Sequence, residues 1–262
     1  MKGSDISLID LNIPHAFVDD IDDPCLSDED AHHFGKVLRL RSGDGITISD
    51  AKGSWRECVY GPPLESTGEI FFEPKPEIEI TIGFALIKKG KPEMVVQKLT
   101  ELGVNKIIPV VAQRSVVQWS ERKVVESEKR FNRIAREAAM QSRQVYIPEV
   151  LRTVPLGILK DQEEIALAQP GGKKLSLTHS CLIIGPEGGW TSAELEGKEC
   201  FSLGGSILRS ETAAISAGVL LTSLRDRRIC EIGEYFYASQ SFHETTSFRG
   251  MRLAGLKSEP MV

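Results

Sequence analysis

Several signals are absent from this chain of 262 residues, and each absence narrows its function. The five cysteines are widely spaced and include no Cys-x-x-Cys pair, which disfavours a disulfide framework or zinc site and favours a reducing cytoplasm. No stretch approaches the run of about eighteen apolar residues that spans a membrane, and the polar N-terminus does not resemble a signal peptide. The five histidines are also scattered, so the sequence predicts no metal site. The lack of a long apolar run likewise predicts no membrane association.

Positive charge is in deficit overall but is concentrated in the middle of the chain. The net charge of −5 argues weakly against a nucleic-acid partner. Residues 76–160, however, hold fifteen Lys or Arg against nine Asp or Glu, a surplus of six. A helix predicted from Ser120 to Arg143 has one apolar face and one basic face, the latter made of Arg122, Lys129, Arg133, Arg136 and Arg143. The residues alone leave open whether this face contacts RNA phosphate or is simply solvated.

Glycine is concentrated in two stretches of the last third. They are LIIGPEGGW from Leu182 to Trp190 and SLGGSILRSETAA from Ser202 to Ala214. Each follows an apolar run typical of a buried strand and leads into a predicted helix, so two turns can meet at neighbouring strand ends of one parallel sheet. Such an edge binds small ligands. The alternative is that both stretches are ordinary strand-to-helix turns. This alternative is less favoured because two such stretches occur so close together.

Capping residues predict where the helices after these turns begin. Thr191 or Ser192 suits the N-cap of the first helix, with Glu194 placed to complete a capping box. Ser210 suits the N-cap of the second helix, which small and apolar residues predict from Glu211 to Leu224.

Residues 1–75 predict a small β-barrel. The strings VLRL, GITISD, WRECVY and EIFFEP have the composition of short strands and are separated by glycine-rich turns. An acidic stretch from Asp19 to Asp30 is expected to face away from phosphate. The boundary with a second domain, 76–234, falls in the Pro/Glu-rich passage from Glu73 to Glu77.

The second domain opens with a strand and a helix, and the chain ends in a tail. TIGFALIK predicts a buried strand, and Pro92 to Leu102 predicts a helix that Gly103 ends. Residues 235–262 have weak periodicity, and no structure is predicted for them.

The two glycine stretches resemble motifs of a known family. GPEGG and LGxxILRSETA are similar to the cofactor-binding motifs of the ribosomal small-subunit methyltransferase E family, SPOUT-class enzymes that methylate N3 of a uridine in 16S ribosomal RNA. The resemblance extends, in the family's order, to HHFGKVLRLRSGD (His32 to Asp44), ALIKKGKPEMVVQKLTELGV (Ala85 to Val104), IIPVVAQRSVV (Ile107 to Val117) and REAAMQSRQVYIPEV (Arg136 to Val150).

The resemblance implies an α/β fold in which a SPOUT-type trefoil-knotted parallel-sheet domain is preceded by a small PUA-like β-barrel domain. It also implies S-adenosylmethionine as cofactor, 16S ribosomal RNA or the small ribosomal subunit as partner, and a homodimer. A knot runs against the general rule that chains do not thread loops, and periodicity does not predict one.

The resemblance further implies roles for particular residues. Arg209 is the candidate for electrostatic catalysis on the uracil, or else braces the knot. Glu187 and Glu211 are candidates to accept the N3 proton, although Glu211 can instead favour a helix N-terminus. The expected cofactor contacts are Gly185, Gly188, Leu203, Gly204, Ile207 and Leu208. The expected RNA contacts are Arg39, Arg41, Arg114, Arg133, Arg136 and Arg143.

The chain departs from the family pattern in four places. Ser206 stands where an arginine is expected, Met140 replaces an acid, Gln144 stands where an arginine is common, and no arginine occurs around His15 to Val18. These losses remove RNA contacts but leave the cofactor loops intact. They leave open the alternative that the chain is a non-catalytic RNA-binding protein that retained the fold. A phosphate-binding α/β enzyme that uses GPEGG as an anion loop has little support, because neither GxxxxGK[ST] nor GxGxxG occurs.

Overall fold

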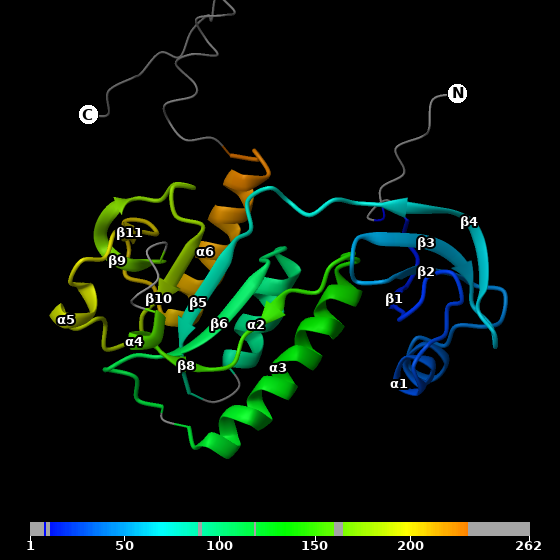
Figure 1. Ribbon diagram of the computed structural model, residues 1–262, viewed down its shortest axis with the longest axis horizontal. Helices are drawn as coiled ribbons and strands as arrows, with labels where there is room; N and C mark the ends of the chain where they lie inside the picture. Colours follow the sequence, from blue (N-terminus) through cyan, green and yellow to red (C-terminus); the bar gives the residue numbers. More distant parts are fainter. Residues whose placement is uncertain (1–7, 9–10, 89–90, 118, 160–164, 230–262) are drawn as a thin grey trace, which may run out of the picture.

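The computed structural model describes residues 8, 11–88, 91–117, 119–159 and 165–229. These residues form a small sheet from the first part of the chain and a larger α/β unit from the rest (Figure 1). The tail of 235–262 lies outside the described residues. No described helix has both the length and the apolar character that a membrane crossing requires.

The small sheet has the strand order β1-β2-β3-β4. Its strands are β1 (His15–Phe17), β2 (Gly45–Ser49), β3 (Ser54–Val59) and β4 (Glu65–Phe72). Strand β1 runs parallel to β2, and the other two pairings are antiparallel. The strands predicted at GITISD, WRECVY and EIFFEP are confirmed, whereas β1 was not predicted.

The strand predicted at VLRL is wrong, because the segment that leads into it is helical. It contains α1 (Asp28–His32) and a π-helical turn, η2 (His33–Val37). The side chain of Ser27 accepts a hydrogen bond from the backbone N–H of Asp30 and so caps α1. Phe34, in the turn, is buried in the core of the small sheet. The cap and this buried ring favour helix over strand.

The large sheet has the strand order β11-β9-β10-β5-β6-β7, with β8 paired to β6, and these pairings are parallel. Its strands are β5 (Thr81–Ala85), β6 (Lys106–Val111), β7 (Glu149–Val150), β8 (Val154–Pro155), β9 (Ile165–Lys174), β10 (Cys181–Ile184) and β11 (Cys200–Ser202). The predicted parallel α/β sheet is therefore confirmed, and the knot stays a prediction.

Helices lie on both faces of the large sheet. Its helices are α2 (Lys91–Glu101), α3 (Glu121–Gln141), α4 (Leu156–Leu159), α5 (Ser192–Leu195) and α6 (Ser210–Arg225). Side chains of α2, α3 and α6 share one core with alternate residues of the strands, such as Ile82 and Leu182. On the opposite face, Ile183 packs with α4 and with Trp190. Since both faces are covered, the strands read as continuous apolar runs.

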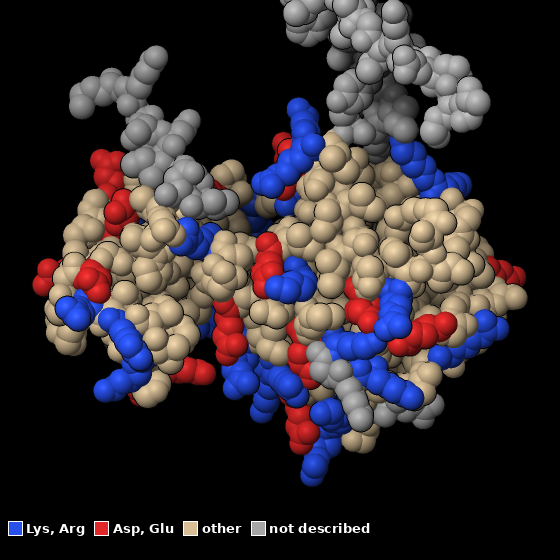
Figure 2. Space-filling model, turned by 180° about the vertical axis from the view of Figure 1, so that it is seen from behind, with Lys and Arg blue, Asp and Glu red and all other residues tan. Residues whose placement is uncertain are grey.

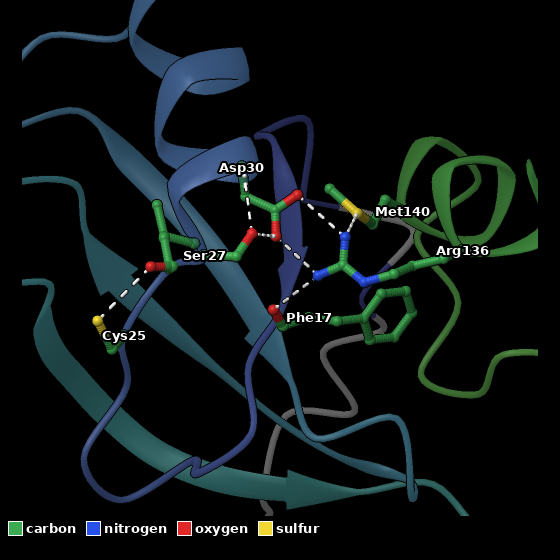
Figure 3. A network of polar contacts seen from close by, with 7 residues as sticks. Phe17, Cys25, Ser27, Asp30, Arg136 and Met140 are labelled. Carbon is green, nitrogen blue, oxygen red and sulfur yellow. Dashed lines mark hydrogen bonds and ion pairs between the residues drawn. The ribbon is translucent and has the colours of Figure 1, made fainter. Parts of the chain in front are cut away.

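The last turns of α3 connect the two sheets. Ala139 and Met140 pack into the core of the small sheet, beside Phe17. The Arg136 guanidinium donates to both carboxylate oxygens of Asp30, at 3.0 and 2.7 Å, and to the carbonyl of Phe17 at 3.2 Å (Figure 3). The Asp30 side chain is only 5 % exposed, so this is a largely buried, bidentate ion pair. Asp30, at the end of the acidic stretch, therefore faces the interior of the molecule.

Two further contacts fix the junction between the sheets. The buried ring of His15 lies 2.9 Å from the Thr47 hydroxyl and 3.2 Å from the carbonyl of Gln144, and burial lowers the pKa of His15 to about 4. The Gln144 side chain donates to the carbonyl of Thr100, at the end of α2. Gln144 and Met140, two of the departures from the family pattern, therefore make structural contacts here.

Candidate active site

A pocket of about 160 Å³ opens at the carboxyl edge of the large sheet. Its walls come from the middle of β9, from the loop after β10 and from the loop between β11 and α6. Both glycine stretches therefore border one site, as the sequence predicts. The lining residues include Ala168, Gln169, Pro170, Gly185, Glu187, Trp190, Leu203, Gly204, Ser206, Ile207, Leu208 and Ser210.

The loop between β11 and α6 forms the open side of the pocket. A β-carbon on Gly204 would meet no atom within 4 Å, and its backbone φ of +148° is one that L-residues rarely adopt. The side chain of Ile207 is 88 % exposed at the rim. An apolar side chain left this open beside a pocket offers surface for a ligand.

Trp190 forms the floor of the pocket. A β-carbon on Gly185 would lie 3.0 Å from its indole ring, so the absence of a side chain at Gly185 lets the ring pack against the backbone. The indole N–H donates to the carbonyl of Ala168 at 2.9 Å. Trp190 thus ties the GPEGG loop to β9.

Gly188 does not line the pocket, although the sequence suggested it as a cofactor contact. It packs against Arg114, whose Cβ would lie 3.1 Å from a β-carbon on Gly188. The Arg114 guanidinium donates to the carbonyls of Gly188 and Trp190, both at 3.1 Å. The lack of a side chain at Gly188 therefore lets Arg114, in the loop between β6 and α3, pack against its backbone.

The capping box predicted after the GPEGG loop is confirmed, with Thr191 as N-cap and Glu194 as its partner. The buried carboxylate of Glu194 also accepts the backbone N–H of Gln113 at 2.8 Å, which joins α5 to the β6–α3 loop. The predicted cap at Ser210 is wrong, because Arg209 is the N-cap residue of α6. The Ser210 hydroxyl instead donates to the carbonyl of Gly185 at 2.6 Å, so it links the two glycine stretches across the pocket.

The two candidate catalytic groups beside this link differ in their partners. Arg209 is exposed, and its side chain has no hydrogen-bond or ion-pair partner within the described part of the chain. Glu211 is held by Lys91 at 2.7 Å, and its side chain is largely buried. The hydrogen bond from Lys91 lowers the pKa of Glu211. A carboxylate with a lowered pKa is a poor proton acceptor, which leaves Glu187, exposed on the pocket wall, as the better candidate.

Two family models match the chain, described as an RNA methyltransferase domain over residues 73–222 and an RNA methyltransferase PUA domain over residues 26–61. The ribosomal RNA small subunit methyltransferase E of Bacillus subtilis is 32% identical over 225 residues, which cover 73% of this chain and 86% of that protein. The Synechocystis protein of that name is 30% identical, over 74% of this chain and 70% of the relative. This chain belongs to the ribosomal RNA small subunit methyltransferase E family. It is therefore an RNA methyltransferase with an N-terminal PUA domain.

Solved structures agree with this membership. The ribosomal RNA small subunit methyltransferase E of Neisseria gonorrhoeae, bound to S-adenosylmethionine, has a TM-score of 0.66 and 26% identity, covering 81% of this chain and 98% of that one. A protein of Legionella pneumophila described as a methyltransferase, in complex with the same cofactor, has a TM-score of 0.71 with the same identity and coverage. The alternative of a non-catalytic RNA-binding protein is not supported.

The basic residues predicted to bind RNA differ in their surroundings. Arg39, Arg41 and Arg133 are exposed, and Figure 2 shows Lys and Arg, interspersed with Asp and Glu, along the lower edge of the molecule. Arg143 follows the end of α3, with a φ of +53°, and donates to Asn12 at 3.0 Å. Arg136 requires a correction, since its guanidinium binds Asp30 and Phe17 at the junction between the sheets. Helix periodicity placed it on the basic face, but that part of the face packs on the small sheet.

The β9 wall of the pocket was missed by the sequence analysis. Ala168, Gln169 and Pro170 line it, within the string IALAQPGG. The signal was present, because an apolar run interrupted by Pro-Gly-Gly indicates a third strand with an irregular backbone at that point, and β9 does continue to Lys174 with a shift in register. Among the described residues, no cluster of three or more His, Cys, Asp or Glu side chains is suited to hold a metal ion.

Proposed function

We propose that this methyltransferase transfers a methyl group from S-adenosylmethionine to N3 of a uridine in 16S ribosomal RNA. The pocket between the two glycine stretches carries the proposal, with Arg209 adjacent in sequence to the lining residues Leu208 and Ser210. Its walls combine apolar side chains with the backbone groups of two loops, which suits an adenosine whose ring needs apolar surface and whose edges need hydrogen bonds. When bound, the cofactor supplies an electrophilic methyl group on a sulfonium. We expect the reaction in the cytoplasm, where small ribosomal subunits are assembled.

The residues around the pocket supply positioning and charge. Attack by N3 requires loss of its proton and spreads negative charge onto the uracil carbonyl oxygens. Arg209 is exposed and makes no hydrogen bond or ion pair among the described residues, and so is available to stabilise that charge. Glu187 lines the pocket, which supports it as the group that accepts the proton. Glu211, paired with Lys91, serves instead to fix the first turn of α6.

We propose that RNA phosphate binds the exposed basic residues Arg39, Arg41 and Arg133. The pair of Arg133 with Glu137, at 3.6 Å between two exposed side chains, is weak enough to yield to a phosphate. Arg39 has a φ of +59° in the turn after η2, at the surface of the PUA domain.

We expect that Gly204→Val weakens cofactor binding at least about tenfold, or about 1.4 kcal/mol. The branched side chain enters the open side of the pocket, and the backbone conformation disfavours any side chain at this φ. Calorimetric titration with S-adenosylmethionine measures the effect. Gly205→Ala is the matched control, because Gly205 has open space around it but does not line the pocket. Equal affinity of a folded Gly204→Val variant and the wild type rules out this placement of the cofactor.

We also infer a homodimer. Half of the apolar side chains of α6 are buried within the chain, whereas Val219 is 41 % exposed on this helix. Val219 and Ile207 each leave apolar surface that a second copy can cover. Light scattering at micromolar concentration should give about 58 kDa, twice the 28.9 kDa of one chain. A mass near 29 kDa would contradict the dimer.

A further inference from the structure

The loop between β6 and α3 is fastened to the segment that follows GPEGG at several points. The backbone N–H of Gln113 donates to Glu194 at 2.8 Å, and the hydroxyl of Thr191 donates to the Gln113 side-chain oxygen at 2.9 Å. Arg114 adds the two bonds to the carbonyls of Gly188 and Trp190. Within the β6–α3 loop, the backbone N–H of Ala112 donates to the hydroxyl of Ser115 at 3.0 Å. A movement of this loop is therefore transmitted to the GPEGG segment.

Arg114 makes these bonds with only part of its guanidinium. Both carbonyls are bound by the same nitrogen, Nη1. Among the described residues, Nε and Nη2 have no hydrogen-bond partner, and the residue is exposed. A guanidinium carries five N–H donors in a fixed planar fork, so the edge formed by Nε and Nη2 can bind two phosphate oxygens while Nη1 keeps its carbonyls.

The carbonyls held by Nη1 belong to the pocket-forming segment. One is the carbonyl of Trp190, whose indole is the pocket floor and is bonded to Ala168 of β9. The other belongs to Gly188, against which the Arg114 side chain packs. Arg114 is thus the described residue that joins an exposed cationic edge directly to the floor of the pocket.

We propose that Arg114 couples RNA binding to cofactor binding, its outer edge holding an RNA phosphate while its Nη1 fixes the pocket floor. This inference rests on the proposed function. RNA bound to the outer edge orders the guanidinium and with it the carbonyls of Gly188 and Trp190, so the cofactor meets a pocket that is already formed. Thermodynamic linkage requires the converse, that bound cofactor tightens RNA binding by the same factor. Arg114 is a positioning residue in this account.

The test compares the affinity for S-adenosylhomocysteine, which cannot donate a methyl group, with and without saturating 16S ribosomal RNA. In the wild type, RNA should tighten binding at least about fivefold, the lower end of typical coupling. In Arg114→Lys the factor should fall below about twofold, because an ammonium keeps the charge but cannot bind phosphate and two carbonyls in one plane. Arg133→Ala is the matched control. It should need more RNA for saturation yet keep the wild-type factor, because Arg133 lies on α3 and does not touch the pocket segment.

Three outcomes decide the matter. A wild-type factor near one, or an Arg114→Lys factor equal to that of the wild type, overturns the coupling while leaving the proposed function intact. Failure of the wild type to bind S-adenosylhomocysteine under any condition overturns the proposed function itself. Tryptophan fluorescence and thermal melting establish that each variant is folded. A packing role alone would change the affinity without RNA and leave the factor unaltered, so the ratio distinguishes the two roles.

Discussion

Arg209→Ala should lower the single-turnover rate of RNA methylation about 100- to 1,000-fold at saturating RNA and cofactor, as the loss of one oxyanion-stabilising donor does in other enzymes. Negative charge reaches the uracil oxygens only as N3 loses its proton, so an interaction with that charge strengthens in the transition state. RNA affinity should fall much less than the rate. Rapid-quench measurement with radiolabelled S-adenosylmethionine separates the two effects.

The structure makes this variant easy to interpret. Arg209 is exposed, and no hydrogen bond or ion pair of its side chain is found among the described residues, so alanine breaks no such bond there. Arg209→Lys is the control, and it should be intermediate because it keeps the charge without the planar fork. Wild-type turnover by Arg209→Ala would show that the catalytic assignment is wrong. A rate loss that higher RNA concentration restores would place Arg209 in substrate binding instead.

The second large effect is on stability. Arg136→Ala should lower the free energy of unfolding by about 3 kcal/mol, the low end for breaking a buried pair, because it leaves Asp30 charged and largely buried. We choose the low end because the Arg136 side chain is still 34 % exposed. Urea unfolding measures the change. Arg133→Ala, one turn earlier on α3, should cost less than about 1 kcal/mol, because its pair with Glu137 is exposed.

The same pair makes stability depend on pH. Burial by itself raises the pKa of Asp30, but hydrogen bonds from Arg136 and Ser27 bring it below the usual value. A depressed carboxylate pKa contributes stability that is present above the ordinary pKa of aspartate and is lost as pH falls through the folded value. Arg136→Ala should therefore flatten the acid limb of the stability curve. A variant as stable as the wild type, with the same acid limb, would contradict the structural role of Arg136.

Arg133 and Arg136, both on α3, also separate stability from RNA binding. Arg133→Ala should reduce the slope of RNA affinity against salt by about one, the signature of one lost phosphate contact. Helix periodicity gives both residues the same prediction, since it places them on one face of α3. It could not distinguish them, because the partner of Arg136 lies 106 residues away in the sequence.

The candidate site shows the same division between local and distant information. The two glycine stretches, their strands and the capping box at Thr191 are local features, and the sequence predicts them. The neighbours of Gly185 and Gly188 are not predicted. Both positions were interpreted as cofactor contacts, yet Gly185 also admits the Trp190 ring, and Gly188 packs against a residue 74 positions away. The sequence indicates that another group can pack closely against the backbone of a glycine, but only the fold shows which group does so.

The error at VLRL has a similar cause. Its apolar alternation resembles a strand, but the segment that leads into it is set by Ser27 capping α1 and by Phe34 entering the core of the small sheet. Local β propensity depends strongly on context and was overridden by these contacts. The acidic stretch was expected to face away from phosphate, and the sequence did not predict that Asp30, at its end, faces the interior and pairs with Arg136.

The central claim is that this chain methylates N3 of a uridine in 16S ribosomal RNA by means of the pocket between its two glycine stretches. The most direct measurement is mass-spectrometric mapping of 16S ribosomal RNA from cells that lack the gene, after incubation of their small subunits with purified protein and S-adenosylmethionine. The account predicts one new N3-methyluridine with the wild-type protein and a greatly reduced yield with Arg209→Ala. No methylated uridine with a folded, cofactor-binding wild-type protein, or a methyl group on another atom, would contradict it.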